Sequence, residues 1–183
     1  MTRCLPMVCG LLCCLPVWAA TVVFTSGDGD GLWGMAANWS TAAVPGIADN
    51  AVVNLGRVAT IAENAAATDR ITVGNGPVTG TVLYIAADIA TNWFRVALAA
   101  DSLGAVTQTA GTVQINSGFE IGPRDTAAGQ GIYRLQGGSL QFPALTLGAA
   151  GAGHLVVAAP QASSIQGQSL RLGSEATLLF ELT

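Results

Sequence analysis

Phe119-Glu120-Ile121-Gly122 alternates apolar and polar residues over three positions and then ends on glycine. The same order of apolar, polar, apolar and then Gly or Ala recurs along the chain. Its other copies are Ile71-Thr72-Val73-Gly74, Phe94-Arg95-Val96-Ala97, Leu145-Thr146-Leu147-Gly148 and Leu170-Arg171-Leu172-Gly173. The last residues of consecutive copies lie 23, 25, 26 and 25 positions apart. A repeat of this length is typical of solenoids, propellers and arrays.

Each repeat also contains other short segments of alternating polarity, such as Thr112-Val113-Gln114-Ile115 and Ile132-Tyr133-Arg134-Leu135. A period of two predicts strands with one buried face. A unit of about 25 residues is too small to bury that face alone, whereas stacked units bury it against one another. We therefore predict an all-β protein, a right-handed parallel β-helix of about 6 coils with about 25 residues in each.

The tetrads predict which side chains point inward. Stacking places each tetrad on the next, so that the apolar positions form two internal ladders. The ladders are Phe94, Phe119, Leu145 and Leu170, and Val96, Ile121, Leu147 and Leu172. The polar positions are expected to face solvent, with Arg95 and Glu120 as an exposed ion pair that contributes about 0.2–1 kcal/mol. We expect Ile121→Asp to prevent folding, and Glu120→Ala to change stability by well under ~1 kcal/mol.

Gly74, Gly122, Gly148 and Gly173 end four of the tetrads, and we expect the chain to turn a corner at each of them. The alternative fold is a β-sandwich or a set of propeller blades joined by hairpins. Tight hairpins favour Asn-Gly or Asp-Gly turns, and Asn75-Gly76 is the one good match between strands. The β-helix therefore remains the preferred prediction.

The N-terminal residues have the organisation of a secretory signal peptide. Arg3 supplies the positive start, a largely apolar segment follows, and small residues stand at Ala19 and Ala20. We predict a leader of residues 1–19, with cleavage after Ala19 or, one residue later, Ala20. All four cysteines lie within this leader, so the mature chain has no disulfide and no cysteine metal site.

Composition excludes some classes of function. The chain has 183 residues, 51% hydrophobic and 10% charged, and no lysine. The mature part carries six arginines against eleven acidic residues, a net charge of −5, and this balance excludes a nucleic-acid partner. After residue 20 no apolar run approaches the roughly 18 residues of a membrane span, so we predict no transmembrane segment in the mature chain.

Residues 20–56 do not follow the tetrad and precede the repeats, which we assign to residues 57–183. An open solenoid end exposes core residues and unpaired strand edges. Large aromatic residues such as Trp33 and Trp39 suit the task of covering that end. We therefore predict that residues 20–56 form an N-terminal cap, with Trp33 and Trp39 as structural residues.

This segment carries a resemblance to a known group. Its Trp33, Asn38-Trp39, Pro45 and Asp49-Asn50-Ala51-Val52-Val53 resemble the opening of bacterial exported β-helix proteins. The stretch from Gly131 to Leu140, Gly-Ile-Tyr-Arg-Leu-Gln-Gly-Gly-Ser-Leu, resembles their coil units. The group includes autotransporter passenger regions and surface proteins with a C-terminal sorting tail. The resemblance implies export to the surface, outer membrane or medium of a Gram-negative-type bacterium, with the periplasm as a further compartment.

One difference from that group concerns the C-terminal side. Neither a barrel nor a sorting tail follows the coils, and the sequence ends in a strand-like segment. We expect a fragment, a truncated reading frame or a short relative of longer proteins. The resulting open edge is expected to bind a partner, either another β-solenoid segment or a surface polysaccharide.

Few residues are candidates for chemistry. Glu120 and Asp125, with Asp101 one coil earlier, are the candidates for a catalytic acid, as in β-helix polysaccharide lyases and hydrolases. Asp28 and Asp30 are candidates for a metal site, although the further oxygen ligands of a calcium loop are missing. We interpret the one histidine, His154, as a solvated turn residue.

These observations favour an exported structural or adhesive module, at the cell surface or secreted, without catalytic activity and without a cofactor. The alternative is a carbohydrate-active or carbohydrate-binding β-helix. Rows of exposed aromatic side chains would favour that alternative, because sugars stack on ring faces. We place Phe94, Phe119 and Phe142 inside the coil instead.

Overall fold

A computed structural model describes residues 19–158 and 163–181 of the chain, so the predicted leader lies outside the described residues except for its last residue. The strands pair in parallel in two sheets. The first sheet consists of β1 (Thr21–Val23), β2 (Asn50–Val53), β4 (Thr68–Val73), β6 (Ile89–Val96), β8 (Thr112–Ile121), β10 (Gly138–Leu147) and β12 (Ser163–Leu172). The second consists of β3 (Val58–Ile61), β5 (Thr81–Ile85), β7 (Ser102–Gln108), β9 (Gly129–Leu135), β11 (Ala152–Ala158) and β13 (Ala176–Glu181).

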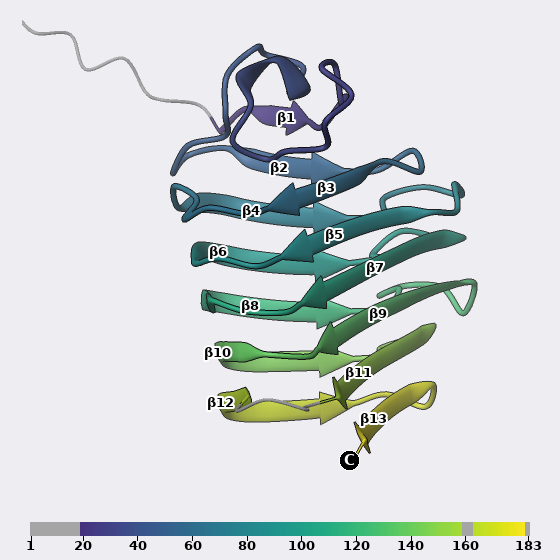
Figure 1. The fold of residues 1–183 in the computed structure, drawn as a ribbon. Coiled ribbons are helices and arrows are strands. Elements are labelled where there is room, and N and C mark those ends of the chain that lie inside the picture. Colours follow the sequence, from purple (N-terminus) through teal and green to yellow (C-terminus); the bar gives the residue numbers. More distant parts are fainter. Residues whose placement is uncertain (1–18, 159–162, 182–183) are drawn as a thin grey trace, which may run out of the picture.

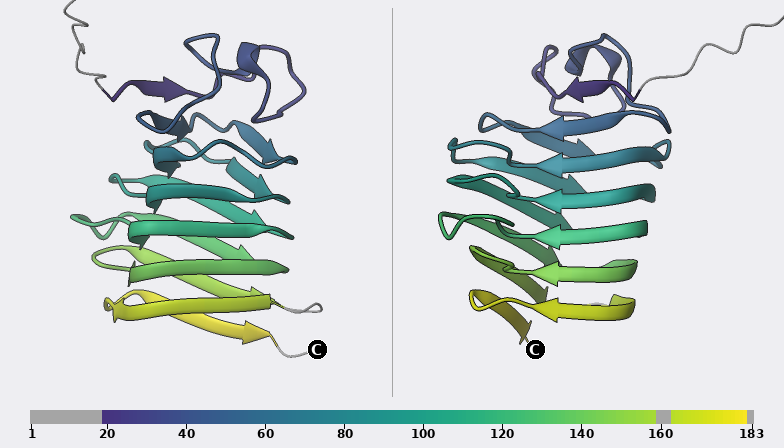
Figure 2. Two further views of the ribbon diagram at one scale, coloured as in Figure 1. Left: turned by 90° about the vertical axis from the view of Figure 1, so that its left-hand side faces the viewer. Right: turned by 180° about the vertical axis from the view of Figure 1, so that it is seen from behind.

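The two sheets are the faces of a single coil. From β2 on, the chain alternates between them, and each strand pairs with the strand of the same sheet one coil earlier and one coil later. The result is the predicted β-solenoid, of about 5 turns with about 24 residues per turn. In Figure 1 the first sheet runs rightward behind the second, which runs leftward, so the coil descends as a right-handed helix. Figure 2 shows the same stack from two other sides.

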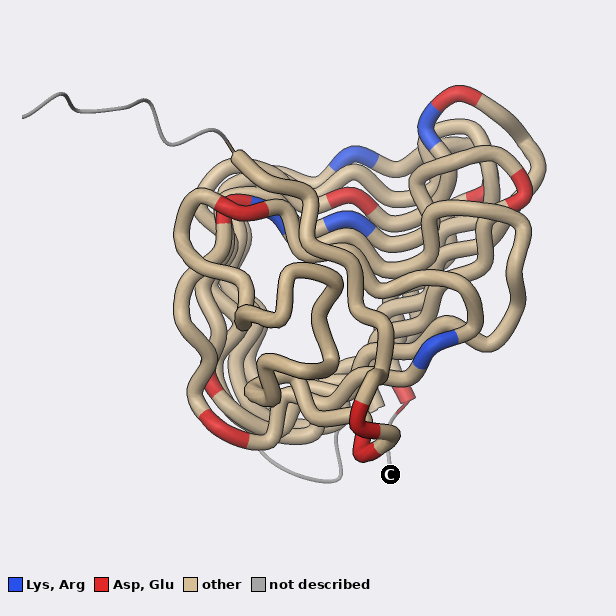
Figure 3. Tube along the Cα trace, turned by 90° about the horizontal axis from the view of Figure 1, so that it is seen from above, with Lys and Arg blue, Asp and Glu red and all other residues tan. Residues whose placement is uncertain are grey.

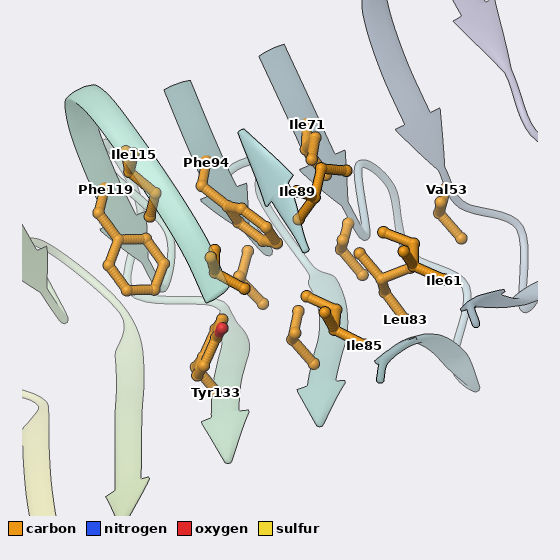
Figure 4. Packing of buried hydrophobic residues seen from close by; sticks show 14 of the residues in the cluster. Val53, Ile61, Ile71, Leu83, Ile85, Ile89, Phe94, Ile115, Phe119 and Tyr133 are labelled. Atoms are coloured by element: carbon orange, nitrogen blue, oxygen red, sulfur yellow. The ribbon is translucent and has the colours of Figure 1, made fainter. Parts of the chain in front are cut away.

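Strand register confirms the two internal ladders. Phe94 pairs with Phe119, Phe119 with Leu145, and Leu145 with Leu170. The rings of Phe94 and Phe119 pack edge to face, with centroids 5.7 Å apart, and Tyr133 of the opposite sheet contacts both. Figure 4 shows these side chains meeting between the two sheets. Phe142 also belongs to this core, as predicted.

The core includes one polar network. Gln108 of β7 and Tyr133 of β9 are both fully buried. The Tyr133 hydroxyl donates to Oε1 of Gln108 at 2.7 Å, and Nε2 of Gln108 donates to the carbonyl oxygens of Gly111 and Ser139, each at 3.0 Å. The carbonyl oxygen and the amino group of the Gln108 side chain are therefore both hydrogen-bonded within the protein. Burial raises the pKa of Tyr133 above its ordinary value, so its hydroxyl remains a donor.

The tetrad corners adopt the conformation that glycine favours. Gly74, Gly122 and Gly148 have φ of 73°, 93° and 61°, and Ala97 takes the same left-handed region with φ 56°. Gly173 has a different reason to be glycine, because an added Cβ would lie against the carbonyl group of Gly148. The left-handed φ values show that the chain turns at the ends of the first four tetrads.

The prediction for the outward residues was wrong in one respect. Thr72 and Glu120 do point outward, yet they are only 6% and 8% exposed. Glu120 is covered because the side chains of Arg95 and Arg124 both lie against its carboxylate. The pair formed by Arg95 and Glu120 exists as predicted, but it is largely shielded from solvent rather than exposed.

An aromatic cluster closes the N-terminal end. Trp39 packs edge to face on Phe24 and on Trp33, with centroids 5.1 and 4.6 Å away. Its Nε1 donates to the carbonyl oxygen of Trp33 at 2.7 Å, and all three rings are buried. A single turn of 3-10 helix, Ala36–Asn38, belongs to the same segment and lies above β2 in Figure 1. The first sheet already begins with β1 and β2, before the residues assigned to the repeats.

The last described coil differs from the others. In it the ladder residues Leu170 and Leu172, and Phe180 of β13, are 46%, 54% and 59% exposed, since no described strand pairs with the outer edges of β12 and β13. Charged residues are sparse and lie on the outside of the stack and in its loops (Figure 3). No helix in residues 19–158 and 163–181 combines the length and hydropathy that crossing a membrane requires.

Candidate binding surfaces

Glu120 is positioned by β8 on the outside of the first sheet. Its Oε2 lies 2.9 Å from Nε of Arg95, its partner on β6, and its Oε1 contacts the Arg124 guanidinium from the loop after β8. The Arg95 guanidinium in turn lies over the ring of Trp93, 4.9 Å from the centroid. The Oε1 atom accepts a hydrogen bond from Arg124, whereas Oε2 and the Arg95 Nε are close without the geometry of a hydrogen bond. The carboxylate is thus arranged as a counter-ion to both arginines.

The two other acids proposed beside Glu120 lie in stacked turns. Asp125 is exposed in the loop between β8 and β9, and Asp101 is exposed in the preceding turn. The backbone joins these turns, because the amide of Asp101 donates to the carbonyl oxygen of Ala128 at 3.0 Å. No hydrogen bond or ion pair of the described residues links either carboxylate to Glu120. The two acids lie on the same side of the solenoid, as the sequence predicted. They do not form a pair with Glu120.

The Asp30 carboxylate makes hydrogen bonds within the N-terminal segment. Its Oδ1 accepts from the backbone amide of Leu32 at 2.9 Å and from Nδ2 of Asn38 at 2.5 Å. Asn38 is fully buried, and its own Oδ1 accepts from the amide of Asp28 at 3.0 Å. The backbone donor and the Asn38 amide lower the pKa of Asp30. These contacts explain the acidic loop as a turn organised by Asn38, and the described residues hold no cluster of three metal-ligating side chains.

His154 lies in a strand rather than in a turn, which corrects its interpretation. It belongs to β11, faces outward between Ile132 and Thr177 of the neighbouring coils, and is half-buried. Its Nε2 is 2.8 Å from Nε2 of Gln130. The alternation Gly153-His154-Leu155 continues the strand pattern, so an outward strand position was readable from sequence.

A pocket of about 250 Å³ separates the cap from the first coil. Its walls are mostly apolar and come from residues 32–35, Val44 and residues 60–66. Trp33 lines it and is 1% exposed, and its Nε1 has no partner among the described residues. The pocket results from the way the cap folds over β3, which residue patterns in the sequence do not reveal.

A second hollow, of about 390 Å³, runs across three coils on the outside of the first sheet. We call it the amide groove. Gln114, Gln141 and Gln166 pair with one another in register along it, and Asn116 and Gln168 stand at its corner. The amide groups of Gln114 and Gln141 donate within their own coils, to Asn116 and Ser139. Among the described residues nothing donates a hydrogen bond to their carbonyl oxygens, which can therefore accept one from a ligand.

The amide groove was not predicted, although the sequence carries its signal. Gln114, Gln141 and Gln166 are separated by 27 and 25 residues, close to the repeat of the tetrads. Residues one repeat apart on the outer face of a solenoid form rows about 4.8 Å apart.

Comparison of the chain with protein-family models, curated proteins and solved structures finds no match.

Proposed function

We propose that the protein is an exported structural or adhesive β-solenoid module, active at the cell surface or in the surrounding medium and without catalytic activity. The observation that carries this proposal is the outer face of the first sheet. There amides and hydroxyls repeat from coil to coil, as in Gln114, Gln141 and Gln166, and in Thr112, Ser139 and Ser164. A regular polar face of this kind fits contact with an extended, repetitive partner better than it fits a single reacting group.

The state of the candidate acids supports the absence of catalysis. The Glu120 carboxylate lies against two arginines, and Asp30 holds a turn. Retaining and inverting glycosidases need two free carboxyl groups at a set separation. The export part of the proposal is supported by the predicted leader and by β1, which begins at Thr21 directly after the predicted cleavage site.

Export is tested by expressing the full chain with its own leader in a Gram-negative host and measuring intact mass in each cell fraction. We expect a species that begins at Ala20 or Thr21 in the periplasm, at the surface or in the medium. A species that keeps Met1 and stays in the cytoplasm would contradict the proposal.

A second candidate function is carbohydrate binding at the amide groove. Its support is the combination of a hollow of about 390 Å³ with amide oxygens on successive coils that accept no hydrogen bond from the described residues, since sugar hydroxyls pair well with amides. An array of neutral oligosaccharides tests it, with the triple variant Gln114→Ala, Gln141→Ala, Gln166→Ala. The matched control is Gln130→Ala with Gln136→Ala, which lie outside the groove. Equal binding by the triple variant and the control would remove the groove as the site.

A further inference from the structure

The dipeptide Asn75-Gly76 is a sequence feature that neither proposed function uses. Its composition is typical of a hairpin turn, yet β4 and β5, the strands on its two sides, belong to different sheets and do not pair with each other. The dipeptide lies instead in residues 74–80, the loop that carries the chain from one face of the coil to the other. Its role is therefore not explained by the pairing of the strands.

An asparagine that precedes a glycine can react with its own backbone. The amide nitrogen of the glycine loses its proton and attacks Cγ of the asparagine side chain, a succinimide ring closes, and the side-chain nitrogen leaves with that proton as ammonia. Water then opens the ring at either carbonyl, which yields aspartate or isoaspartate. Glycine favours ring closure, because it has no Cβ beside the attacking nitrogen and adopts the widest range of φ.

Asn75 and Gly76 have the freedom that this reaction needs. Asn75 is exposed, and its side chain makes no hydrogen bond with the described residues. The amide of Gly76 donates no hydrogen bond to any described group, and nothing lies within 4 Å of a Cβ built at this residue. The attacking nitrogen therefore has no hydrogen bond to break and no neighbouring atom that obstructs the ring.

The other asparagines of the chain lack this combination, since none of them precedes a glycine. At Asn64 the nitrogen that would attack belongs to Ala65, and it donates to the carbonyl oxygen of Asp88 at 2.9 Å. The Oδ1 of Asn64 is also engaged, because it accepts from the amide of Asp88. Asn116 is exposed as Asn75 is, but Ser117 follows it and places a Cβ beside the nitrogen.

We propose that Asn75 is a modification site, at which the folded protein converts this asparagine into aspartate and isoaspartate through a succinimide. Water is the only co-reactant. The product adds a negative charge to a protein that is already acidic, and isoaspartate also adds a carbon to the main chain. Residues 75–80 contribute no side chain to the core, so the stack tolerates the change and the protein accumulates it with age. This inference does not depend on export, adhesion or the amide groove.

The test is peptide mass spectrometry of the purified protein, kept folded in buffer for increasing times. Trypsin releases residues 71–95 as one peptide, because Arg70 and Arg95 bound it, and this peptide holds Asn92 as an internal control. Fragment masses locate the change, and chromatography separates the two isomers. We expect both isomers at Asn75 before any product at the other asparagines. The rate should rise about 10-fold for each pH unit, because the attacking nitrogen must lose its proton.

Variants of the loop identify the reacting atoms. Gly76→Ala places a methyl group beside the nitrogen, and Asn75→Gln requires a larger ring, so both should lose the early product. Val78→Ala is the matched control, since it lies in the same loop, is also exposed and leaves the dipeptide intact. It should keep the natural rate. The melting temperature of each variant verifies that it is folded.

Three outcomes would overturn the proposal. Product at Asn75 only after unfolding in urea would mean that the folded loop prevents ring closure. Equal rates at Asn75 and Asn116 would mean that exposure, and not the glycine, decides where the chain reacts. An unchanged rate in Gly76→Ala would exclude the glycine as the cause of the reaction at Asn75.

Discussion

The Trp93 ring lies directly against Gly118, its partner in the next coil, where an added Cβ would come within 2.3 Å of the ring atom Cζ3. The same relationship recurs on the next pair of coils, where the Phe142 ring covers Gly167 at an equally short separation. In both pairs an aromatic side chain on one strand occupies the space that a side chain on the neighbouring strand would need. The two sites show that contacts between coils, outside the core as well as inside it, decide which residues are allowed.

We predict that Gly118→Ala destabilises the protein by about 1–3 kcal/mol, because the new methyl group forces the Trp93 ring away. Urea unfolding followed by tryptophan fluorescence measures the effect. Gly34→Ala is the control, since nothing lies within 4 Å of a Cβ at that position. Adding Trp93→Ala to Gly118→Ala should recover part of the loss, and equal effects of Gly118→Ala and Gly34→Ala would contradict the explanation.

A second prediction revises the contrast between Ile121 and Glu120. Ile121→Asp buries an unpaired carboxylate and should prevent folding. Glu120→Ala should cost about 1–3 kcal/mol, more than an exposed pair would, because Arg95 stays covered without its counter-ion. Thr146→Ala, in the same outward row, is the control and should change stability by less than ~0.5 kcal/mol. Denaturant midpoints compare the three, and a Glu120→Ala effect as small as the control would mean that solvent reaches Arg95.

The buried network provides a third prediction. Tyr133→Phe leaves Oε1 of Gln108 without its donor and should destabilise the protein by about 1–3 kcal/mol. Tyr84→Phe is a matched control, because Tyr84 is 43% exposed and lies on the outer face of the same sheet. Thermal unfolding of both variants measures the difference. Similar melting temperatures for the two variants would show that water replaces the lost donor.

A fourth prediction separates strain from crowding at the corners. Gly122 and Gly29 both have positive φ, of 93° and 76°. A Cβ at Gly122 would also meet the carbonyl oxygen of Ala152 at 2.7 Å, whereas nothing lies within 4 Å at Gly29. Gly29→Ala should therefore show the backbone cost alone, about 1–2 kcal/mol, and Gly122→Ala should lose clearly more. Equal losses in chemical denaturation would mean that the coil relaxes to admit the methyl group.

A fifth prediction concerns acid. The hydrogen bonds from Leu32 and Asn38 lower the pKa of Asp30 below its ordinary value of 3.8. Stabilisation by Asp30 is therefore fully present above that value and is lost as the pH falls through the lower pKa of the folded protein. Melting temperature measured from pH 5 to pH 2 should fall less steeply in Asp30→Asn than in the natural protein. Asp125→Asn, at an exposed loop position, should keep the natural slope.

The ladders and corners could be predicted because they depend on local alternation. The pattern around Phe119 and Ile121 requires one buried face, and its return after one repeat sets the register with Leu145 and Leu147. The aromatic cluster lies where that pattern breaks, at Trp33 and Trp39. These features belong to short segments, and the solenoid stacks short segments without rearranging them.

The covering of Glu120 could not be predicted in the same way. It depends on Arg124, which returns from a loop, and on Arg95, which Trp93 holds in place. Side-chain direction in a loop is not set by a period of two.

In a chain of similar repeats, a strand can pair with the wrong repeat during folding. If β7 paired with β11 instead of β9, Leu155 would occupy the place of Tyr133 and Val157 that of Leu135. Gln108 would then lose its hydroxyl partner, and an unsatisfied buried amide costs about 1–3 kcal/mol. The Gln108–Tyr133 hydrogen bond therefore favours pairing of β7 with β9 over pairing of β7 with β11. It helps to prevent a strand from pairing with the wrong coil.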